Sequence, residues 1–431
     1  MPNLSRRYFL RGSALLLGGV VLRRAAPSSL VRLAAARVAD APGRPLRVLA
    51  LGDSVMWGQG LRDEHKFTHK LRDWLCEQRG GGGCRNEEDV QLHVEAHSGA
   101  VVARPDDDAG RAAEERFTRD IAPVRYYGEV NHAYPTLWGQ LELARRHYAG
   151  ASIPPGEIDL VLVNGGINDL NATKILLYKI LGGDLTEKAK EFCGEMMAEF
   201  LDTLSGAFPN ARIVVPGYFP LVSTSTPRDV IVRAIRDLLP DAGEERRLAE
   251  RLTSRMLREH EGDGSQRGEP KPSRILRKLS ERSKEWVKAS NDALEGAVKA
   301  LNDKHPPLTA ARCGEAAPPP EAPARALFVP VPFGDDNAYA APRSFLWKLG
   351  HKPPDTVIEC VDKNVLENLV TEDEMQDKRP CMCDHADKRN DVSCVRAGTF
   401  HPNREGADAY FRAIKQRLEN VACFAGWTPA G

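Results

Sequence analysis

A serine in the stretch RVLALGDSVMWGQGL, Arg47–Leu61, is the first residue of the chain whose surroundings suggest chemistry. Ser54 follows a run of apolar residues typical of a buried strand. It precedes a segment in which apolar residues recur every four positions from Phe67, as in a helix. Ligands of open α/β sheets bind at the carboxyl ends of strands, where such a serine projects its Oγ into a crevice. Ser54 is therefore a candidate nucleophile, although its hydroxyl could also serve only in a tight strand-to-helix turn.

A serine hydroxyl becomes a useful nucleophile only beside a base. Among 11 histidines, His401 stands out in GTFHPNREGADAYF, in a loop directly before the last predicted helix. Pro402 keeps the chain out of the helix, and Asn403 can cap the helix start. A histidine held in such a turn suits a general base, while the alternative is an ordinary surface histidine.

Two glycine-containing stretches could supply hydrogen-bond donors to an oxyanion, which acyl chemistry requires. AHSGA, 96–100, ends the second predicted strand with Gly99, whose backbone N–H can approach a substrate closely. NGGINDL, 164–170, ends the third predicted strand with Asn168, whose amide can donate. A helix cap is the alternative role for Asn168, because Asn is favoured at such positions.

The four candidate residues occur in one order, each at the end of a successive predicted element: Ser54, Gly99, Asn168 and His401. This ordered set resembles the SGNH hydrolases, also called the GDSL esterase/lipase family, whose four blocks are named for Ser, Gly, Asn and His. GDSVMWGQGL looks like the first block, SGA the second, GIND the third and HPN the last. The resemblance covers roughly residues 45–220 and 325–420.

The resemblance implies that Ser54 attacks an ester carbonyl, with His401 acting as general base and then as general acid. It also implies an oxyanion hole made by the amides of Ser54 and Gly99 and by the Asn168 side chain. The family's chemistry needs no metal and no organic cofactor. The implied protein is a secreted serine esterase or lipase that acts on a small-molecule, lipid or acylated-sugar ester. A carbohydrate O-deacetylase of the same fold and a non-catalytic binding protein on that fold are the alternatives.

The sequence departs from the family's pattern at one position. The family usually has Asp three residues before the histidine, where it fixes the imidazole tautomer, and this chain has Gly398 there. We expect a main-chain carbonyl to orient His401 instead. Asp391 is a more distant candidate for an acidic partner, with Asp384 and Asp387 behind it.

Five short apolar runs predict buried strands: RVLAL (47–51), VQLHVEA (90–96), DLVLVNG (159–165), ARIVVPG (211–217) and ALFVPV (326–331). Most lack strict alternation, as expected of parallel strands covered on both faces. Helical apolar spacing lies between them and in the tail, where one face carries Ala407, Tyr410, Ile414 and Leu418. Strands that alternate with helices predict an α/β fold, a three-layer α/β/α sandwich, and the resemblance implies that its parallel sheet is flavodoxin-like.

A single hydrolase domain is expected over residues 42–425. Residues of about 225–304 depart from the strand–helix pattern, because they are dense in charge and contain no convincing strand. They predict a helical insertion, which either packs on the flank of the domain or forms a lid over the site. GEAAPPPEAPA, 314–324, predicts a Pro/Ala linker back to the sheet.

The N-terminal residues resemble a twin-arginine export signal. SRRYFLRG, Ser5–Gly12, has paired arginines, and the apolar stretch SALLLGGVVL follows it. This stretch is shorter than the roughly 20 apolar residues of a spanning helix. Residues 1–41 are predicted to be a cleaved signal, with an uncleaved anchor as the alternative. The expected partner is the twin-arginine export machinery, and the expected location is the periplasm or the exterior of a bacterium.

Nine cysteines follow that signal, at positions 76, 84, 193, 313, 360, 381, 383, 394 and 423. In an exported protein they are candidates for disulfides. Cys76 and Cys84 flank the short loop EQRGGGG, which a disulfide could close. CMCDHADKRNDVSC, Cys381–Cys394, favours disulfides over a metal knot that would include His385, because its spacing matches no zinc pattern.

Composition limits the class of partner. The chain has 431 residues, 42% of them hydrophobic, which is enough for a sizeable core. Lys and Arg together number 60 and so do Asp and Glu, so the formal net charge is zero. A nucleic-acid partner is therefore not expected, because it would favour a strong basic excess.

Overall fold

The structure is a computed structural model of the chain. The residues that it describes are 44–79, 89–105, 108, 110–112, 127–130, 136–170, 175–176, 184–238, 247, 250–256, 274–305, 307, 324–349, 370–371, 373–385 and 392–420. They belong to the unit Pro45–Gly431, apart from Arg44, which ends the unit Met1–Arg44. The predicted export signal, 1–41, lies outside the described residues, as does the predicted linker up to residue 323.

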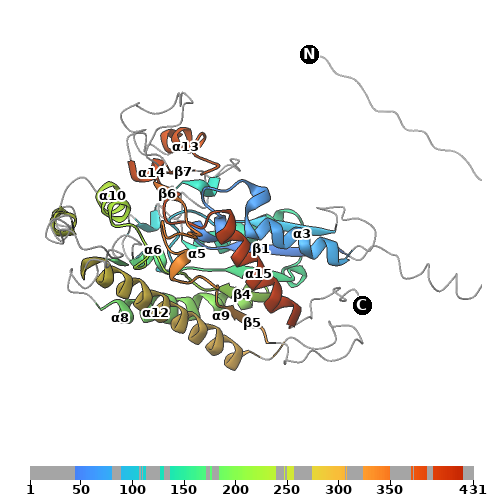
Figure 1. The fold of residues 1–431 in the computed structure, drawn as a ribbon. Helices are drawn as coiled ribbons and strands as arrows, with labels where there is room; N and C mark the ends of the chain where they lie inside the picture. Colours follow the sequence, from blue (N-terminus) through green and yellow to red (C-terminus); the bar gives the residue numbers. More distant parts are fainter. Residues whose placement is uncertain are drawn as a thin grey trace, which may run out of the picture. The chain divides into compact units, whose positions relative to one another are not determined.

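A five-stranded parallel sheet forms the centre of the unit Pro45–Gly431 (Figure 1). The strands are β1 (Leu46–Leu51), β2 (Val90–Val94), β3 (Leu160–Val163), β4 (Arg212–Pro216) and β5 (Ala326–Val329). Each predicted run forms one of them. All residues of β3 and β4 are buried, which explains why these strands are apolar without alternation.

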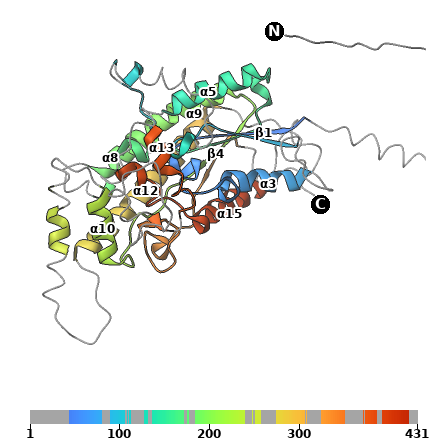
Figure 2. The same cartoon turned by 90° about the horizontal axis from the view of Figure 1, so that it is seen from above.

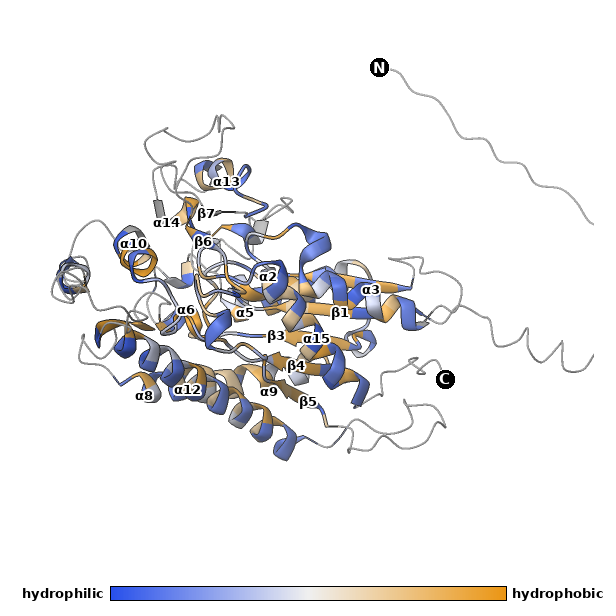
Figure 3. Cartoon of the chain, in the orientation of Figure 1, coloured by the Kyte–Doolittle hydropathy of each residue, from blue (hydrophilic) through white to orange (hydrophobic). Residues whose placement is uncertain are grey.

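Helices cover both faces of the sheet, and this confirms the predicted three-layer α/β/α class. One face carries α3 (Phe67–Arg79) and α15 (Arg404–Asn420). The other carries α5 (Leu137–Gly150), α9 (Met197–Ala207) and α12 (Arg274–Lys304), as Figure 2 shows from above. The helices are amphipathic, with apolar residues toward the sheet (Figure 3). In α15 the four apolar residues predicted to share a face are all buried.

Shorter elements make up the connections in the described ranges. They are α2 (Ser54–Trp57), η1 (Asp63–His65), η3 (Tyr127–Glu129), η4 (Pro155–Glu157), α6 (Ile167–Leu170), α8 (Leu185–Ala189), the π-helical η6 (Lys190–Met196), α10 (Arg228–Leu238), η8 (Asp335–Asn337), β6 (Lys348–Leu349), β7 (Val370–Thr371), α13 (Arg379–His385) and α14 (Val392–Val395). None of the helices in the described part of the chain is long and apolar enough to span a bilayer.

The strand order is β2-β1-β3-β4-β5, which is the flavodoxin-like order. The connections from β1 and from β3 leave in opposite directions, so a crevice forms between the carboxyl ends of these strands. Ser54 follows β1, and Asn168 follows β3. The fold therefore brings two of the candidate residues to the edge where such folds bind ligands.

From Arg228 on, the charged region of about 225–304 is helical wherever the structure describes it. Its second half, α12, connects β4 to β5 and packs on β5, α8 and α9. Parallel neighbours need a crossover of this kind, and the buried face of α12 includes Trp286, Leu294 and Leu301. This half of the region is therefore part of the core as well as a departure from the short connections elsewhere.

Disulfides involve four cysteines in the described ranges. Cys383 and Cys394 are bonded to each other and join α13 to α14. Cys76 and Cys381 are each disulfide-bonded as well. The three cysteines of the Cys381–Cys394 segment are thus engaged as disulfides, as predicted, rather than in the alternative metal knot. The described residues contain no cluster able to hold a metal ion. Cys84 lies outside the described residues, so its bond to Cys76 stays a prediction.

The place of α12 in the core can be tested by stability. Leu294→Ala removes a side chain with no exposed surface and should lower the free energy of unfolding by about 2 to 5 kcal/mol. Lys288→Ala, at a side chain 78% exposed on the same helix, should change it by less than about 0.5 kcal/mol. Urea denaturation followed by circular dichroism measures both. Equal, small effects would mean that α12 is peripheral.

Candidate active site

The turn that carries Ser54 is fixed by close contacts around Gly52. This glycine has a φ of +148°, and a Cβ there would lie 2.1 Å from Asn164 Oδ1. The Gln140 side chain binds both backbone groups of Gly52, since Oε1 accepts from the N–H at 2.7 Å and Nε2 donates to the carbonyl at 2.9 Å. Only glycine fits this position, so the chain can leave the end of β1 along only one path.

Asp53 begins the helix on which Ser54 lies. Its Oδ1 accepts from the Val55 N–H at 2.8 Å as an N-cap. The Tyr218 hydroxyl donates to Oδ2 at 2.6 Å, and Asn164 Nδ2 donates to Oδ1 at 3.0 Å. Burial raises the pKa of Asp53, and these hydrogen bonds act against that rise. The carboxylate thus anchors the turn that carries Ser54 to loops after β3 and β4.

His401 and Ser54 are in direct contact. His401 Nε2 lies 2.6 Å from Ser54 Oγ, across 347 positions of sequence. His401 Nδ1 lies 3.1 Å from the main-chain carbonyl of Thr399. A carbonyl can only accept, so Nδ1 carries the proton and Nε2 is left to accept from the serine hydroxyl. This is the geometry that activates a hydroxyl.

The loop before α15 holds the imidazole by its backbone. His401 O accepts from Trp347 N at 2.9 Å, and Phe400 N donates to Trp347 O at 3.3 Å. Phe400 has a φ of +68°, a left-handed conformation that costs a non-glycine residue about 1 to 3 kcal/mol. Asn403 Oδ1 caps α15 by accepting from Gly406 N at 3.0 Å. Hydrogen bonds of the residues on both sides of His401 thus stabilise the strained conformation of Phe400.

The electrostatic surroundings keep the imidazole neutral. Burial lowers the pKa of His401 to about 4, although the Thr399 carbonyl and the negative charge of Glu129 act in the opposite direction. The positive charge of Arg379 lowers the pKa further. Above about pH 5 the imidazole is therefore a free base.

Gly99, in the turn after β2, and Asn168, on the short helix α6 after β3, lie at the same edge of the sheet. Gly99 has a φ of +80°, and Asn168 Nδ2 donates to the carbonyl of the next residue, Ala100, at 2.9 Å. The Asp169 carboxylate accepts from Val102 N at 3.0 Å on the same loop. The amide of Asn168 has two N–H groups, and the bond to Ala100 uses one. The alternative role of Asn168 as a simple helix cap is therefore not what its side chain does.

Of the three acidic candidates, the structure describes only Asp384. Asp384 lies on α13, while His401 Nδ1 faces the Thr399 carbonyl. Asp391 and Asp387 lie outside the described residues. Gly398 is in the turn before His401, and its carbonyl accepts from His401 N at 3.0 Å.

Sequence reasoning missed several residues that fix the site. Asp53 and Asn164 stand inside the quoted motifs, yet the motifs do not reveal that they bind each other. Gln140 and Tyr218 lie far from any motif, on α5 and after β4. A polar residue inside an apolar helical or strand pattern is the only signal that could have indicated them.

Comparisons with known proteins identify distant structural neighbours. The chain is similar to an extracellular lipase from Streptomyces rimosus, with a TM-score of 0.39 and 11% identity over 86% of this chain and 99% of that one. It is similar to phospholipase A1 from Streptomyces albidoflavus NA297, with a TM-score of 0.32 and 13% identity over 86% and 99%. No family model and no curated protein matches the chain. Similarity of this size does not assign an activity.

The state of His401 can be tested directly by NMR. Because burial lowers its pKa to about 4, its imidazole should stay neutral from pH 8 to about pH 5 and become protonated near pH 4. The ring signals in a ¹⁵N-histidine sample, assigned with His401→Gln, measure this titration. A midpoint at the ordinary value of about 6.5 would contradict the buried environment.

Proposed function

We propose that this protein is a serine hydrolase that cleaves carboxylic ester bonds. The observation that carries the proposal is the Ser54 Oγ–His401 Nε2 distance of 2.6 Å, with Nδ1 held by the Thr399 carbonyl. A nucleophile beside a base that is itself oriented by a third group is the usual signature of covalent acyl transfer. The third group here is a main-chain carbonyl rather than a carboxylate.

The proposed reaction proceeds through an acyl-enzyme. Ser54 Oγ forms a bond to the ester carbonyl carbon while its proton passes to His401 Nε2. The tetrahedral intermediate collapses, the bond to the alcohol oxygen breaks, and the proton on Nε2 passes to the leaving alcohol. Water then attacks the acyl-enzyme with His401 again as base, which releases the acid and restores Ser54.

The oxyanion is proposed to bind three donors, the amides of Ser54 and Gly99 and the side chain of Asn168. Their placement at the carboxyl ends of β1, β2 and β3, which are adjacent in the sheet, supports this role. Each such donor typically contributes a factor of about 10² to 10³ in kcat. No step of this mechanism uses a metal or an organic cofactor.

A cavity beside α12 favours a lipid ester as the substrate. Asn291 binds Tyr218 after β4, and Asn302 binds Ala326 at the start of β5, so α12 runs from the carboxyl edge to the amino edge. Leu279, twelve residues before Asn291, therefore lies about 18 Å beyond the carboxyl edge at 1.5 Å per residue. The start of α12 thus projects on the same side of the sheet as Ser54.

This cavity has a volume of about 630 Å³. Apolar side chains of Leu176, Leu252, Ile275 and Leu279 line it. Its charged lining residues are five cations and one carboxylate: Arg251, Arg255, Arg274, Lys278, Arg282 and Glu281. An apolar lining with a positive rim suits an acyl chain next to an anionic head group. The helical region is accordingly proposed to act in binding lipid.

Export is the remaining part of the proposal. Disulfides persist in oxidising compartments, and Cys76, Cys381, Cys383 and Cys394 are all bonded in this way. Together with the twin-arginine-like N-terminus, they support a periplasmic or extracellular location.

The mechanism predicts which substitutions remove activity. Ser54→Ala and His401→Ala should each abolish hydrolysis of p-nitrophenyl esters, and Asn168→Ala should reduce kcat by about 10² to 10³. Asp391→Asn should leave most of the activity, because the Thr399 carbonyl orients the imidazole. A fluorophosphonate probe should label the protein at Ser54. A folded wild-type protein that never reacts with the probe would instead favour the binding protein, and a preference for acetylated sugars would favour the O-deacetylase.

The cavity predicts a dependence on lipid charge. Arg251→Glu with Lys278→Glu should reduce hydrolysis of phosphatidylglycerol vesicles at least about tenfold, since each basic residue near an anionic surface contributes about 1 kcal/mol. Hydrolysis of p-nitrophenyl butyrate should not change. Lys288→Glu with Lys299→Glu, on the exposed face of the same helix, is the matched control. An equal loss in both double variants would mean that the cavity is not involved.

A further inference from the structure

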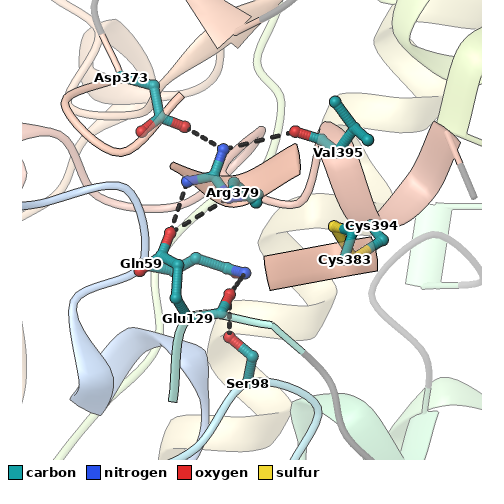
Figure 4. The surroundings of a disulfide bond; sticks show 8 residues. All are labelled: Gln59, Ser98, Glu129, Asp373, Arg379, Cys383, Cys394 and Val395. Carbon is teal, nitrogen blue, oxygen red and sulfur yellow. Dashed lines mark hydrogen bonds and ion pairs between the residues drawn. A yellow bond between two sulfur atoms is a disulfide. The ribbon is translucent and has the colours of Figure 1, made fainter. Parts of the chain in front are cut away.

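A guanidinium with no exposed surface lies close to the Ser54–His401 pair. Arg379 at the start of α13 binds two carboxylates whose side chains are also fully buried (Figure 4). Its Nη2 and Nε donate to Glu129 Oε1 at 2.5 and 3.2 Å, and its Nη1 donates to Asp373 Oδ2 at 2.5 Å. Two negative charges and one positive charge make up this cluster.

Burial of three charges is not explained by stability. Removing ions from water is expensive, and an apolar replacement for a buried ion cluster is often neutral or stabilising. The cluster also joins segments that are far apart in the chain, because Glu129 is on η3 and Asp373 and Arg379 are about 250 residues later. The contacts of the cluster with neighbouring segments indicate its role.

Glu129 holds the segment that follows Ser54. Its Oε2 accepts from Trp57 Nε1 and its Oε1 accepts from Gly60 N, both at 2.9 Å. The main-chain carbonyl of Glu129 accepts from Gln59 Nε2 at 2.6 Å and from Ser98 Oγ at 3.1 Å. Ser98 directly precedes Gly99. One residue of the cluster thus fixes the end of α2 and the turn after β2.

Asp373 holds the segment that precedes His401. A Cβ on Gly398 would lie 2.3 Å from Asp373 Oδ2 and 3.3 Å from Arg379 Nη2. Gly398 does not have a left-handed φ, so it is the lack of space that excludes a side chain. The space in which an aspartate at 398 would begin is therefore occupied by a carboxylate from another part of the chain.

The disulfide holds this arrangement from the other side. Cys383 lies one turn after Arg379 on α13, and it is bonded to Cys394 on α14. The carbonyl of Val395, at the end of α14, is 3.5 Å from Arg379 Nη1. Gly398 follows three residues later. The helix that carries Arg379 is thus joined covalently to the segment that leads into His401.

The cluster also reaches the imidazole by its charge. The negative charge of Glu129 raises the pKa of His401, and the positive charge of Arg379 lowers it. Other charged groups around these elements pair among themselves, as Glu374 does with His65 and Arg404, and Lys66 with Asp63.

We propose that Glu129, Arg379 and Asp373 form a positioning unit that aligns the Ser54 turn with the His401 loop and, through its opposite charges, sets how readily the imidazole takes up a proton. Asp373 occupies the space in which an aspartate at position 398 would begin, while the Thr399 carbonyl orients the imidazole itself. The proposal rests on the Ser54–His401 function proposed above. None of the three residues is a catalytic residue, since the cluster acts through His401 and through the backbone around Ser54.

Opposite charge changes in the cluster should move the activity of His401 in opposite directions. Glu129→Gln removes a charge that favours the imidazolium. In a profile of the Ser54 fluorophosphonate-labelling rate against pH, the acid limb should therefore move to lower pH. Arg379→Gln removes a charge that disfavours the imidazolium, so the limb should move to higher pH. Each shift should be at least about 0.5 pH unit, since a nearby charge moves a pKa by about 1 to 3 units and a more distant one by less.

The control is Asp202→Asn, which removes a surface carboxylate paired with Lys304 and His305 and should leave the limb unmoved. A purely structural cluster would lower thermal stability in both cluster variants without opposite shifts, and that result would overturn the proposal. Labelling of the wild type at Ser54 is read separately. Failure of that labelling contradicts the proposed function, whereas failure of the shifts alone contradicts only the cluster's role.

A carboxylate exchange keeps the proposal testable if the charge variants do not fold. Gly398→Asp alone should collide with Asp373, and Asp373→Ser alone should leave Arg379 short of a partner, so each should lose at least about tenfold in labelling rate. The double variant should recover most of that loss, because it returns one carboxylate to the same space. Losses that simply add in the double variant would overturn the proposal.

Discussion

The hydrogen bond between His401 Nε2 and Ser54 Oγ is the constraint on which the rest of the site depends. A distance of 2.6 Å leaves little tolerance, and each partner is on a backbone segment that could not take another path. Gly52 passes against Asn164 with no space for a side chain, and Phe400 holds a left-handed φ. The parallel sheet supplies the frame, because its strand order opens a crevice at the edge where β1 ends.

Two buried polar networks flank the serine and together explain its rigidity. Asp53 gathers donors from the loops after β3 and β4 on one side, and Glu129 gathers donors from α2 and the turn after β2 on the other. Fully satisfied networks of this kind rigidify and specify a unique arrangement. Donors that are fixed before a reaction starts need no reorganisation as negative charge develops.

The sequence predicted the sheet, the class of fold and the residues at the ends of three strands, because buried strands and tight turns leave local patterns. The carbonyl expected near His401 is Thr399 O. Glu129, Asp373 and Arg379 could not be predicted, since each lies in an irregular segment or a short helix and their attraction acts across about 250 residues. The packing of α12 agrees with the expected alternative in which the charged region packs on the domain, but the sequence pattern did not indicate that this helix is the crossover from β4 to β5.

The separation of Ser54 from His401 has a consequence in time. A ribosome that adds about 5 to 20 residues per second needs on the order of 20 to 70 s to pass from one to the other, given the 347 positions between them. Throughout that interval the growing chain carries a serine without its base. α15, which packs on α3 and β5, follows the histidine directly. The same late step therefore completes the core and brings His401 to Ser54, so an unfinished chain has the serine without this contact.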